Sequence, residues 1–489
     1  MEHFVSTVAL IGIVIVVAAL LSGAVERSGV PIVAVFLALG AALGPWGLGL
    51  ANIDLDSSVL ESVATLALAL VLFSDAVTLD LKEVRSRRRL ALRLLGPGTL
   101  APAVVIALAA WGLLGISVPA AAILGAALAS TDPVLLRSVL RSRALPGPTR
   151  VALRLESGMN DAVLLPIVIL AMVIEHAGAP GQGSVATVLI HRAVGLFLLG
   201  PALGALVGLV GIIVLGRVRG SIGVRRDYES LYALGLAFTA YAVAESVGGS
   251  GFLAAFAAGL LVAAQDIELC DCFLEYGEAT AEMLLLLTFV ALGMSVIWSG
   301  LGVIDVRTIV FAVVALAART VVLLPMLKGV GLTARERRLI ALFGPRGLSS
   351  LLFTLLPVFA GVPGAGYLFA VACLVVLLSV LLHGSGMALF LRASHRGRTD
   401  ARAATSKEDE TDHAPDAATP APDRITIAEV QALLSRGENI LPVDSRADRS
   451  YRASDLQARG AVRLPPEDPV RDATEMRLSR HATLVVYCA

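Results

Sequence analysis

Asp132 lies beside a proline in the segment LASTDPVLLRSVL (residues 128–140), whose surroundings are otherwise apolar. Pro133 has no backbone N–H and disfavours the helical conformation of the residue before it, so a helix is expected to unwind here. Unwinding leaves backbone carbonyls without helical partners, next to a carboxylate and the hydroxyl of Thr131. Because small hard cations prefer such oxygen ligands, the segment predicts a cation site at a broken helix.

The segment RLESGMNDAVLLP carries a second group of polar side chains in apolar surroundings. Ser157 and Asp161 are four residues apart and share one face of a helix, while Glu156 and Asn160 share the neighbouring face. A hydroxyl, Asp161 and Asp132 would together form an oxygen cage with net negative charge. Burial favours the neutral form of a carboxylate, so protons compete with the cation for these oxygens. Such competition is the basis of cation/proton antiport.

A second break is predicted in GPRGLSS (residues 344–350), where two glycines and a proline interrupt an apolar stretch. Two interrupted spans in corresponding positions of two halves indicate a binding site near the midplane of an inverted-repeat transporter. Ionisable groups inside spans are functional hypotheses by default. Arg346 lies in this second break, and we expect it to pair with the buried Glu156 and to lock the two interrupted elements together.

Each candidate also has a structural interpretation without a ligand. The hydroxyls of Thr131 and Ser157 can bond to carbonyls of their own helices. Asp132 and Asp161 can form ion pairs with arginine, and Arg319 can cap the carbonyls of a broken helix. A cation channel would use similar residues, but it would not need a site that titrates.

The composition is typical of a membrane protein with many spans. The 489 residues are 57% hydrophobic and 16% charged, and the mean hydropathy of +0.82 is too high for a soluble chain of this length. We expect an all-α membrane domain over residues 1–395, with two discontinuous helices. Its spans, about 13 in number, are expected at residues 4–25, 30–50, 59–79, 91–115, 119–140, 150–175, 185–216, 228–247, 251–265, 281–298, 307–328, 337–360 and 365–391.

The charge distribution predicts the orientation of the chain. Short loops rich in Arg alternate with loops that have no Lys or Arg. We therefore expect a protein of the plasma membrane, with its N-terminus outside the cell and its C-terminal tail in the cytoplasm. The formal net charge is zero. No global field therefore favours a nucleic acid as a partner.

Four motifs resemble those of the cation/proton antiporter superfamily, in particular the sodium/proton exchangers of the NhaP type. They occur in the family's order: STDP (130–133), ESGMNDA (156–162), GGSGFLAAFAAGLL (248–261) and GPRGLSS (344–350). The resemblance implies a 13-helix inverted-repeat fold and a homodimer. It also implies transport by an elevator motion of a core domain against a dimerisation domain.

The resemblance further implies roles for the site residues. Asp132 and Asp161 would carry the ion and the proton, with Ser157 and the carbonyl of Thr131 as further ligands. Relatives commonly have FEGG with a glutamate in the third span, whereas this chain has FSDAVTLD. Asp75 is the corresponding carboxylate here, and its shorter side chain is expected to reach the ion only through water.

Exchange is predicted to be electroneutral, with one cation for one proton. In the family, an asparagine at the position of Asn160 goes with electroneutral exchange, and Asn160 orients the site. Asn160 cannot titrate, and Glu156 is expected to be held ionised by Arg346. Asp132 and Asp161 are then the titratable groups of the core.

The implied function is secondary transport and not enzymatic catalysis. The transported species would be H⁺ and a monovalent cation, Na⁺ first, with K⁺ or Li⁺ as alternatives, and a role in pH homeostasis follows. No cofactor is expected. The expected partners are these ions, the lipid bilayer and a second copy of the chain.

The end of the chain differs from the rest. Residues 396–424 are rich in Ala, Pro, Thr, Asp and Glu and predict a disordered linker. In residues 425–489, ITIAEVQALLSRG, PVDSRADRSY, RGAVRLPPEDP and LVVYCA resemble the start of an α/β rhodanese domain, in which the cysteine corresponding to Cys488 carries a persulfide. The loop that would cradle this persulfide is absent, so we expect an inactive module. The alternative function is a membrane-tethered sulfurtransferase or a sulfur- or redox-sensing regulator of ion transport.

Overall fold

The computed structural model describes residues 32–45, 47–49, 53–79, 81–132, 145–177, 193–221, 226–265, 271–294 and 296–408. It also describes short stretches elsewhere, including 440–446, 457–464 and 482–487. The chain forms two compact units, Met1–Ala403 and Ala404–Ala489.

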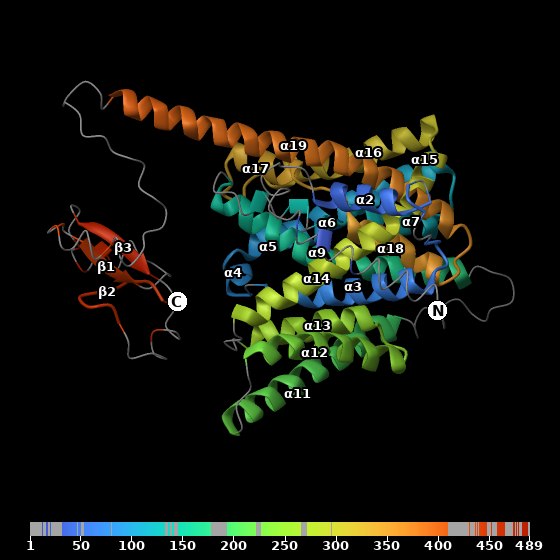
Figure 1. Cartoon of the computed structure of the whole chain (residues 1–489). Helices are drawn as coiled ribbons and strands as arrows, with labels where there is room; N and C mark the ends of the chain where they lie inside the picture. The colour runs from blue at the N-terminus through green and yellow to red at the C-terminus, as the bar shows by residue number, and fades with distance from the viewer. Residues whose placement is uncertain are drawn as a thin grey trace. The chain divides into compact units, whose positions relative to one another are not determined.

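The first unit is a bundle of helices (Figure 1). Its described helical elements are α2 (Ile32–Leu43), α3 (Ser58–Val77), α4 (Leu81–Ser86), α5 (Arg88–Leu95), α6 (Pro97–Ala109), η1 (Ala110–Leu114), α7 (Val118–Ala129), α9 (Gly147–Ala177), η2 (Gly195–Leu199), α11 (Gly200–Ser221), α12 (Arg226–Ser246), α13 (Gly251–Ala264), α14 (Asp271–Met294), η3 (Val296–Trp298), α15 (Ser299–Gly302), α16 (Val306–Met326), α17 (Ala334–Leu342), α18 (Leu348–Phe359) and α19 (Ala365–Glu408).

Six helical segments among the described residues are long and apolar enough to cross a membrane, and a seventh arises if a pair bent by 58° counts as one span. The six are Ser58–Val77, Arg88–Leu114, Gly147–Glu175, Gly195–Ser221, Val306–Met326 and Ala365–Met387, and the bent pair is Met283–Met294 with Val296–Gly302. Shorter apolar helices include α2, α7, α13 and α18. The expected span 4–25 lies almost wholly outside the described residues. A count of 13 spans therefore stays a prediction.

Helix α7 lies in the middle of the bundle. Ser117 caps its N-terminus by accepting the N–H of Ala120 at 3.2 Å, and Pro119 lies in the first turn, where its missing N–H has no helical partner to lose. Nearly every residue from Ala120 to Ala129 is buried. Small side chains let α6, α9 and α18 pack closely around it.

Close approach of helices on the other side of the bundle depends on glycine. Gly204 of α11 lies against the backbone of Ala254 in α13, and Gly259 of α13 lies against the carbonyl of Phe73 in α3. A Cβ atom at either glycine would overlap that backbone. Figure 1 shows the result, in which α11, α12 and α13 lie in layers beside α3 and α14.

Helix α19 extends into the segment that the sequence predicted to be a disordered linker. It continues to Glu408, and the Ala-rich run after residue 400 allows a helix that began in the apolar part to propagate at little cost. Residues 409–424 lie outside the described part of the chain. The expected boundaries at 395 and 424 stay predictions.

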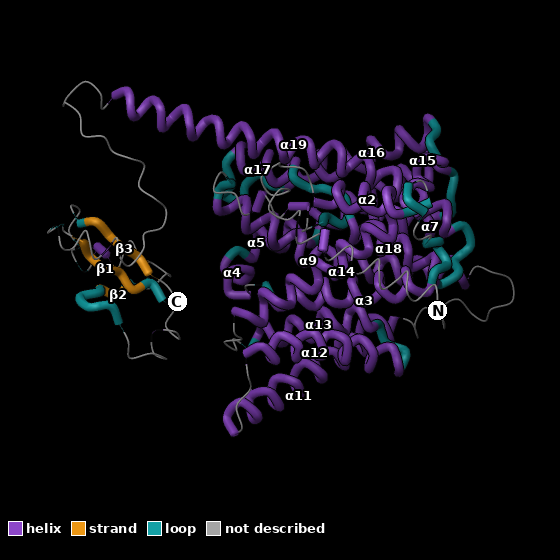
Figure 2. The backbone as a smooth tube through the Cα atoms, in the orientation of Figure 1, coloured by secondary structure: helices purple, strands orange, loops and turns teal. Residues whose placement is uncertain are grey.

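The second unit contains a three-stranded parallel sheet in the order β2-β1-β3 (Figure 2). Its strands are β1 (Ile440–Asp444), β2 (Val462–Arg463) and β3 (Thr483–Tyr487). Parallel strands need crossover connections, as in α/β proteins. Cys488 lies outside the described residues, so the rhodanese resemblance and any activity of this tail stay predictions.

Asp444, at the end of β1, is the centre of a polar cluster in the sheet. Arg446 donates to Oδ1 from Nε at 2.9 Å and to Oδ2 from Nη2 at 2.7 Å. The hydroxyl of Tyr487 in β3 donates to Oδ2 at 3.1 Å. The hydrogen bonds from Arg446 lower the pKa of Asp444 to about 2. This carboxylate is therefore ionised at neutral pH and links β1 to β3.

Candidate ion-binding site

The first break follows α7, where the sequence predicted it. The helix ends at Ala129, Ser130 is extended with φ −60° and ψ 141°, and Thr131 and Asp132 are also non-helical. Pro133 lies outside the described residues. The last carbonyls of α7 therefore receive no hydrogen bonds from the N–H groups of a following helical turn.

The second break separates α17 from α18. Helix α17 ends at Leu342 and α18 begins at Leu348, so the GPRG stretch between them is not helical. Gly347 lies directly against the carboxylate of Asp132, and a Cβ atom at this position would overlap it. Only glycine lets the two breaks come this close.

Asp132 joins the two breaks with both its backbone and its side chain. Its N–H donates to the carbonyl of Pro345 at 3.0 Å. Its Oδ2 accepts the N–H of Leu348 at 2.7 Å, at the first residue of α18. The side chain is buried, with 2% of the residue exposed. The positive end of the α18 dipole stabilises this buried negative charge.

Arg346 caps the broken end of α7. Its Nη1 donates to the carbonyl oxygens of Ala129 at 2.5 Å and Ser130 at 2.9 Å. Its backbone N–H donates to the hydroxyl of Ser379 in α19 at 2.7 Å. The guanidinium thus supplies the donors that the unwound helix lacks.

The predicted ion pair between Glu156 and Arg346 is wrong. Glu156 of α9 instead pairs with Arg319 of α16, whose Nε and Nη2 donate to Oε1 at 2.7 Å and to Oε2 at 2.6 Å. The remaining guanidinium nitrogen of Arg319, Nη1, donates to the carbonyl of Ala341 near the end of α17 at 2.8 Å. A planar guanidinium fork satisfies a buried carboxylate best when it is bidentate, and Arg319 is the arginine placed to do so. Arg319 and Arg346 thus have exchanged roles relative to the sequence-based expectation.

Asp161 and Asn160 of α9 face the first break. The hydroxyl of Ser130 donates to Asp161 Oδ1, and Asn160 Nδ2 donates to the hydroxyl of Thr131 at 2.8 Å. Asp161 and Asn160 are each 1% exposed. Asp161 Oδ2 and Asn160 Oδ1 have no hydrogen-bond partner in the described part of the chain. Because buried polar atoms are normally satisfied, these two oxygens mark a place for a ligand.

The other two predicted side-chain ligands, Ser157 and Asp75, make the following contacts. Ser157 is buried, but its hydroxyl faces the carbonyl of Arg154 in its own helix at 3.5 Å. Asp75 of α3 is half-buried and lies against Gly158 of α9, one residue from Ser157. The structure thus places Asp75 beside the turn of α9 that leads to Asp161.

Two hydroxyl residues of the site were missed by the sequence analysis. Ser130 bonds to Asp161, and Ser349 of α18 approaches the same carboxylate. Both lie inside quoted motifs, STDP and GPRGLSS. A serine in a span usually bonds to its own helix, so residue type alone gave no signal for them. Their role depends on the crossing of the two breaks.

The donor set suits a hard cation better than a transition metal. Among the described residues, no group of three or more His, Cys, Asp and Glu side chains is placed to hold a metal ion. Asp132, Asp161, Asn160 and Thr131 instead offer carboxylate, amide and hydroxyl oxygens. Such hard ligands are typical of alkali and alkaline-earth cations.

The sequence matches a known family over most of its length. The family model for "Sodium/hydrogen exchanger, transmembrane" matches residues 13–393. Relatives include the K(+)/H(+) antiporter NhaP of Alkalimonas amylolytica, 28% identical over 390 residues (78% of this chain, 66% of the relative), and the K(+)/H(+) antiporter NhaP2 of Shewanella oneidensis, 28% identical over 381 residues (76% and 64%). The Na(+)/H(+) antiporter 2 of Zygosaccharomyces rouxii is 29% identical over 212 residues (42% and 26%). The matches thus span just under two thirds of the K(+)/H(+) relatives.

The fold also matches a solved structure. The sodium proton antiporter MjNhaP1 from Methanocaldococcus jannaschii at pH 8 superposes with a TM-score of 0.65 at 20% identity, over 80% of this chain and 99% of that one. The expected fold family is therefore confirmed for the membrane domain. The chain belongs to the sodium/hydrogen exchanger family, whose members are multi-pass membrane transporters and not enzymes.

Proposed function

We propose that the chain exchanges a monovalent cation for protons at the crossing of its two interrupted helices. The observation that carries this proposal is the buried Asp161, whose Oδ2 has no partner in the described part of the chain and lies near Asn160 and the first break. A carboxylate in such a place needs either a cation or a proton. Asp161 therefore serves as the carboxylate for which the two species compete.

Asp132 has a different role in this proposal. Its Oδ2 accepts the N–H of Leu348, so the helix terminus holds it in the charged form. Asp132 then supplies constant negative charge, while Asp161 alternates between proton and cation. The carbonyl of Thr131 and the Oδ1 atom of Asn160 complete the oxygen set, and Ser157 and Asp75 act through water.

Electroneutral exchange is supported by the charges around the site. Glu156 and Arg319 cancel as a bidentate pair. At the crossing of the two breaks, the charges that remain are those of Asp132, Asp161 and Arg346, which sum to minus one. One cation or one proton brings this sum to zero, so both loaded states carry the same charge. Electroneutrality also requires Asp75 to keep the same protonation state in both loaded states. The membrane potential, which acts at about 2.3 kcal/mol per charge per 100 mV, then exerts no net force on either.

Na⁺ is proposed as the first ion, with K⁺ as the alternative and Li⁺ as a further substrate. The names of the relatives include both K(+)/H(+) and Na(+)/H(+) antiporters, and carboxylate, amide and hydroxyl oxygens accept each of these ions. An elevator motion within a homodimer, with N-terminus outside and tail in the cytoplasm, completes the proposal. The elevator motion, in which the site moves as one body, is supported by the hydrogen bonds that join Asp132 to Pro345 and Leu348 across the two breaks.

The test measures ion-dependent proton flux in proteoliposomes that contain the full chain. Addition of Na⁺, K⁺ or Li⁺ to wild type should dissipate an imposed pH gradient, and Asp161→Asn should abolish this signal. The matched control is Asp305→Asn, because Asp305 caps the exposed start of α16 and asparagine caps helices equally well. Flux that persists in a folded Asp161→Asn protein would remove Asp161 from the mechanism.

A further inference from the structure

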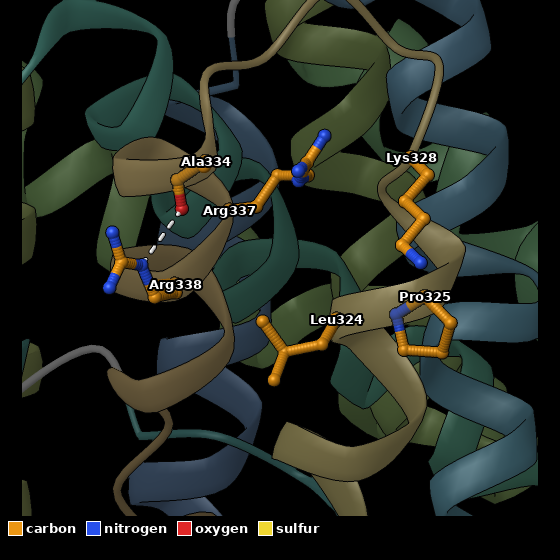
Figure 3. A pocket seen from close by; sticks show the side chains of 6 residues that line it. All are labelled: Leu324, Pro325, Lys328, Ala334, Arg337 and Arg338. Atoms are coloured by element: carbon orange, nitrogen blue, oxygen red, sulfur yellow. Dashed lines mark hydrogen bonds between the residues drawn. The ribbon is translucent and has the colours of Figure 1, made fainter.

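A pocket of about 300 Å³ lies between the end of α16 and the start of α17, away from the ion site (Figure 3). Its lining combines three cationic side chains with an apolar floor. The residues are Leu324, Pro325, Lys328, Ala334, Arg337 and Arg338. Neither the exchange reaction nor the helix packing described above uses these cations.

Positive charge gathers in the lining of the pocket. Figure 3 shows Lys328 and Arg337 on the two neighbouring chain segments above Leu324, while Arg338 folds back onto the carbonyl of Ala334, to which its Nε donates at 3.3 Å. The nearby acid Glu336 does not line the pocket and is held at the start of α17. Its Oε2 accepts the N–H and the hydroxyl of Thr333 in a capping box, at 2.7 Å and 2.8 Å. Among the residues that the structure describes, the lining contains three cations and no acid.

The position of Lys328 is fixed from a neighbouring helix. Arg93 of α5 donates from Nη1 to the carbonyl oxygens of Met326 at 3.3 Å and Lys328 at 2.7 Å. These bonds cap the end of α16 and hold its last turn in place. Arg93 also adds a further positive charge beside the pocket. Hydrogen bonds between helices therefore fix the shape of the pocket at the end of α16.

The exposed face of α16 leads into the pocket from the apolar side. Exposed apolar residues recur at intervals of three or four along this helix: Val306 (75% exposed), Val310 (44%), Val313 (61%), Ala317 and Val321 (67%). This spacing continues to Leu324 and Pro325 in the pocket floor. Such a stripe on a helix of spanning length faces lipid chains. A free phosphate has no apolar part that could contact it.

We propose that this pocket binds the phosphate group of an anionic phospholipid, with the acyl chains along the exposed face of α16. The two ends of the site fit the two parts of the molecule: cations for the headgroup and an apolar stripe for the chains. Basic pockets between membrane helices on the cytoplasmic side recognise anionic headgroups in this way. The proposal does not depend on which cation is transported.

A bound lipid would act on both elements that reach the ion site. Helix α16 carries Arg319, and α17 leads directly into the break that contains Arg346. Bridging Lys328 and Arg337 through one phosphate relieves their repulsion and holds the two helices at a fixed separation. Anionic lipid should therefore stabilise the full protein against heat.

The experiment uses the full chain in detergent and the probe lipid dioleoyl phosphatidylglycerol, with dioleoyl phosphatidylcholine as the chain-matched neutral lipid. Native mass spectrometry counts retained lipid, and thermal unfolding reports stabilisation. The double variant Lys328→Gln/Arg337→Gln is compared with Arg335→Gln/Arg217→Gln, which removes two exposed arginines that do not line the pocket. Leu324→Trp fills the pocket floor and leaves every charge in place.

Binding of phosphatidylglycerol should be about tenfold weaker in the pocket double variant and unchanged in the control double variant. Leu324→Trp should lose the lipid as well. Equal loss in both double variants would overturn the proposal, because general surface charge would then suffice. Full stabilisation by glycerol phosphate or inorganic phosphate alone would also overturn it, since the site would then be one for a free phosphate. Lipid retention by a folded Leu324→Trp protein would likewise place the lipid elsewhere.

Discussion

The Glu156 carboxylate and the Arg319 guanidinium form a buried bidentate pair, with the side chains 5% and 3% exposed. The pair joins α9, which carries Asp161, to α16. Arg319 also reaches Ala341 at the end of α17. One guanidinium therefore fixes the relative positions of the helix with the titrating aspartate and the helix before the second break.

Removing either partner of this pair should destabilise the protein. An uncompensated buried charge costs about 3–5 kcal/mol, so Glu156→Gln and Arg319→Met should each lower the unfolding temperature. Glu156→Gln/Arg319→Met should recover part of the loss, because no charge is left unpaired. The measurement is thermal unfolding of the purified variants, with Glu156→Gln/Arg346→Met as the comparison. Equal recovery in that second double variant would contradict the pairing seen in the structure.

Gly347→Ala should disrupt the crossing of the two breaks. The new Cβ atom overlaps the Asp132 carboxylate, so either that side chain or the start of α18 must move. We expect a loss of transport together with lower stability. Gly366→Ala is the matched control, because a Cβ atom there meets nothing within 4 Å. Normal flux in Gly347→Ala liposomes would show that the contact is not needed.

Ser130→Ala should lower the apparent affinity of Asp161 for the cation when protons compete with it. The Ser130 hydroxyl donates to Asp161 Oδ1, which favours the ionised form of the carboxylate. A hydrogen bond to a charged group is worth about 1.5–3 kcal/mol, so the apparent cation affinity at acidic pH should fall about tenfold. The difference should shrink at alkaline pH, where protons no longer compete. Ser221→Ala, which removes an exposed hydroxyl bonded to the carbonyl of Arg217 in its own helix, should leave this pH dependence unchanged.

In the tail, Arg446→Met should loosen the sheet at neutral pH. Asp444 has its pKa lowered from 3.8 to about 2 by Arg446, so its contribution to stability is complete above pH 3.8 and is lost as the pH falls toward 2. Without Arg446, the carboxylate loses its main partner and β1 should exchange its amide hydrogens faster. Hydrogen exchange of the full chain, measured for β1 between pH 7 and pH 3, checks this. An unchanged exchange rate at pH 7 would show that Arg446 contributes nothing to the sheet.

The sequence predicted the positions of the two breaks because proline and glycine act locally. Pro133 disfavours the helical conformation of the residue before it, and two glycines and a proline weaken a helix over the GPRG stretch. The four-residue spacing of Ser157 and Asp161 is a property of any helix. The partner of Glu156, in contrast, depends on tertiary packing and could not be predicted locally. Two buried arginines lay in apolar segments, and only the crossing of α16 with α9 decides which one reaches the carboxylate.

The roles of the hydroxyls show the same limit. Ser130 and Ser157 have the same side chain and similar apolar neighbours, but Ser157 lies within a continuous helix and Ser130 lies beyond the end of one. A helical serine has a carbonyl of its own helix within reach, whereas an extended one does not. Ser130 is therefore available to Asp161, and Ser157 faces Arg154.

The bonds of Asp132 also have a consequence for how the protein is made. Asp132 and the carbonyls of Ala129 and Ser130 receive their donors from residues 346 and 348, more than two hundred positions later in the chain. During synthesis, the first broken helix enters the membrane long before those donors emerge from the ribosome. Until then, water or the insertion machinery must satisfy its carboxylate and carbonyls, since lipid has no donors to offer. We therefore expect the nascent first half to remain incomplete until Arg346 and Leu348 have been inserted.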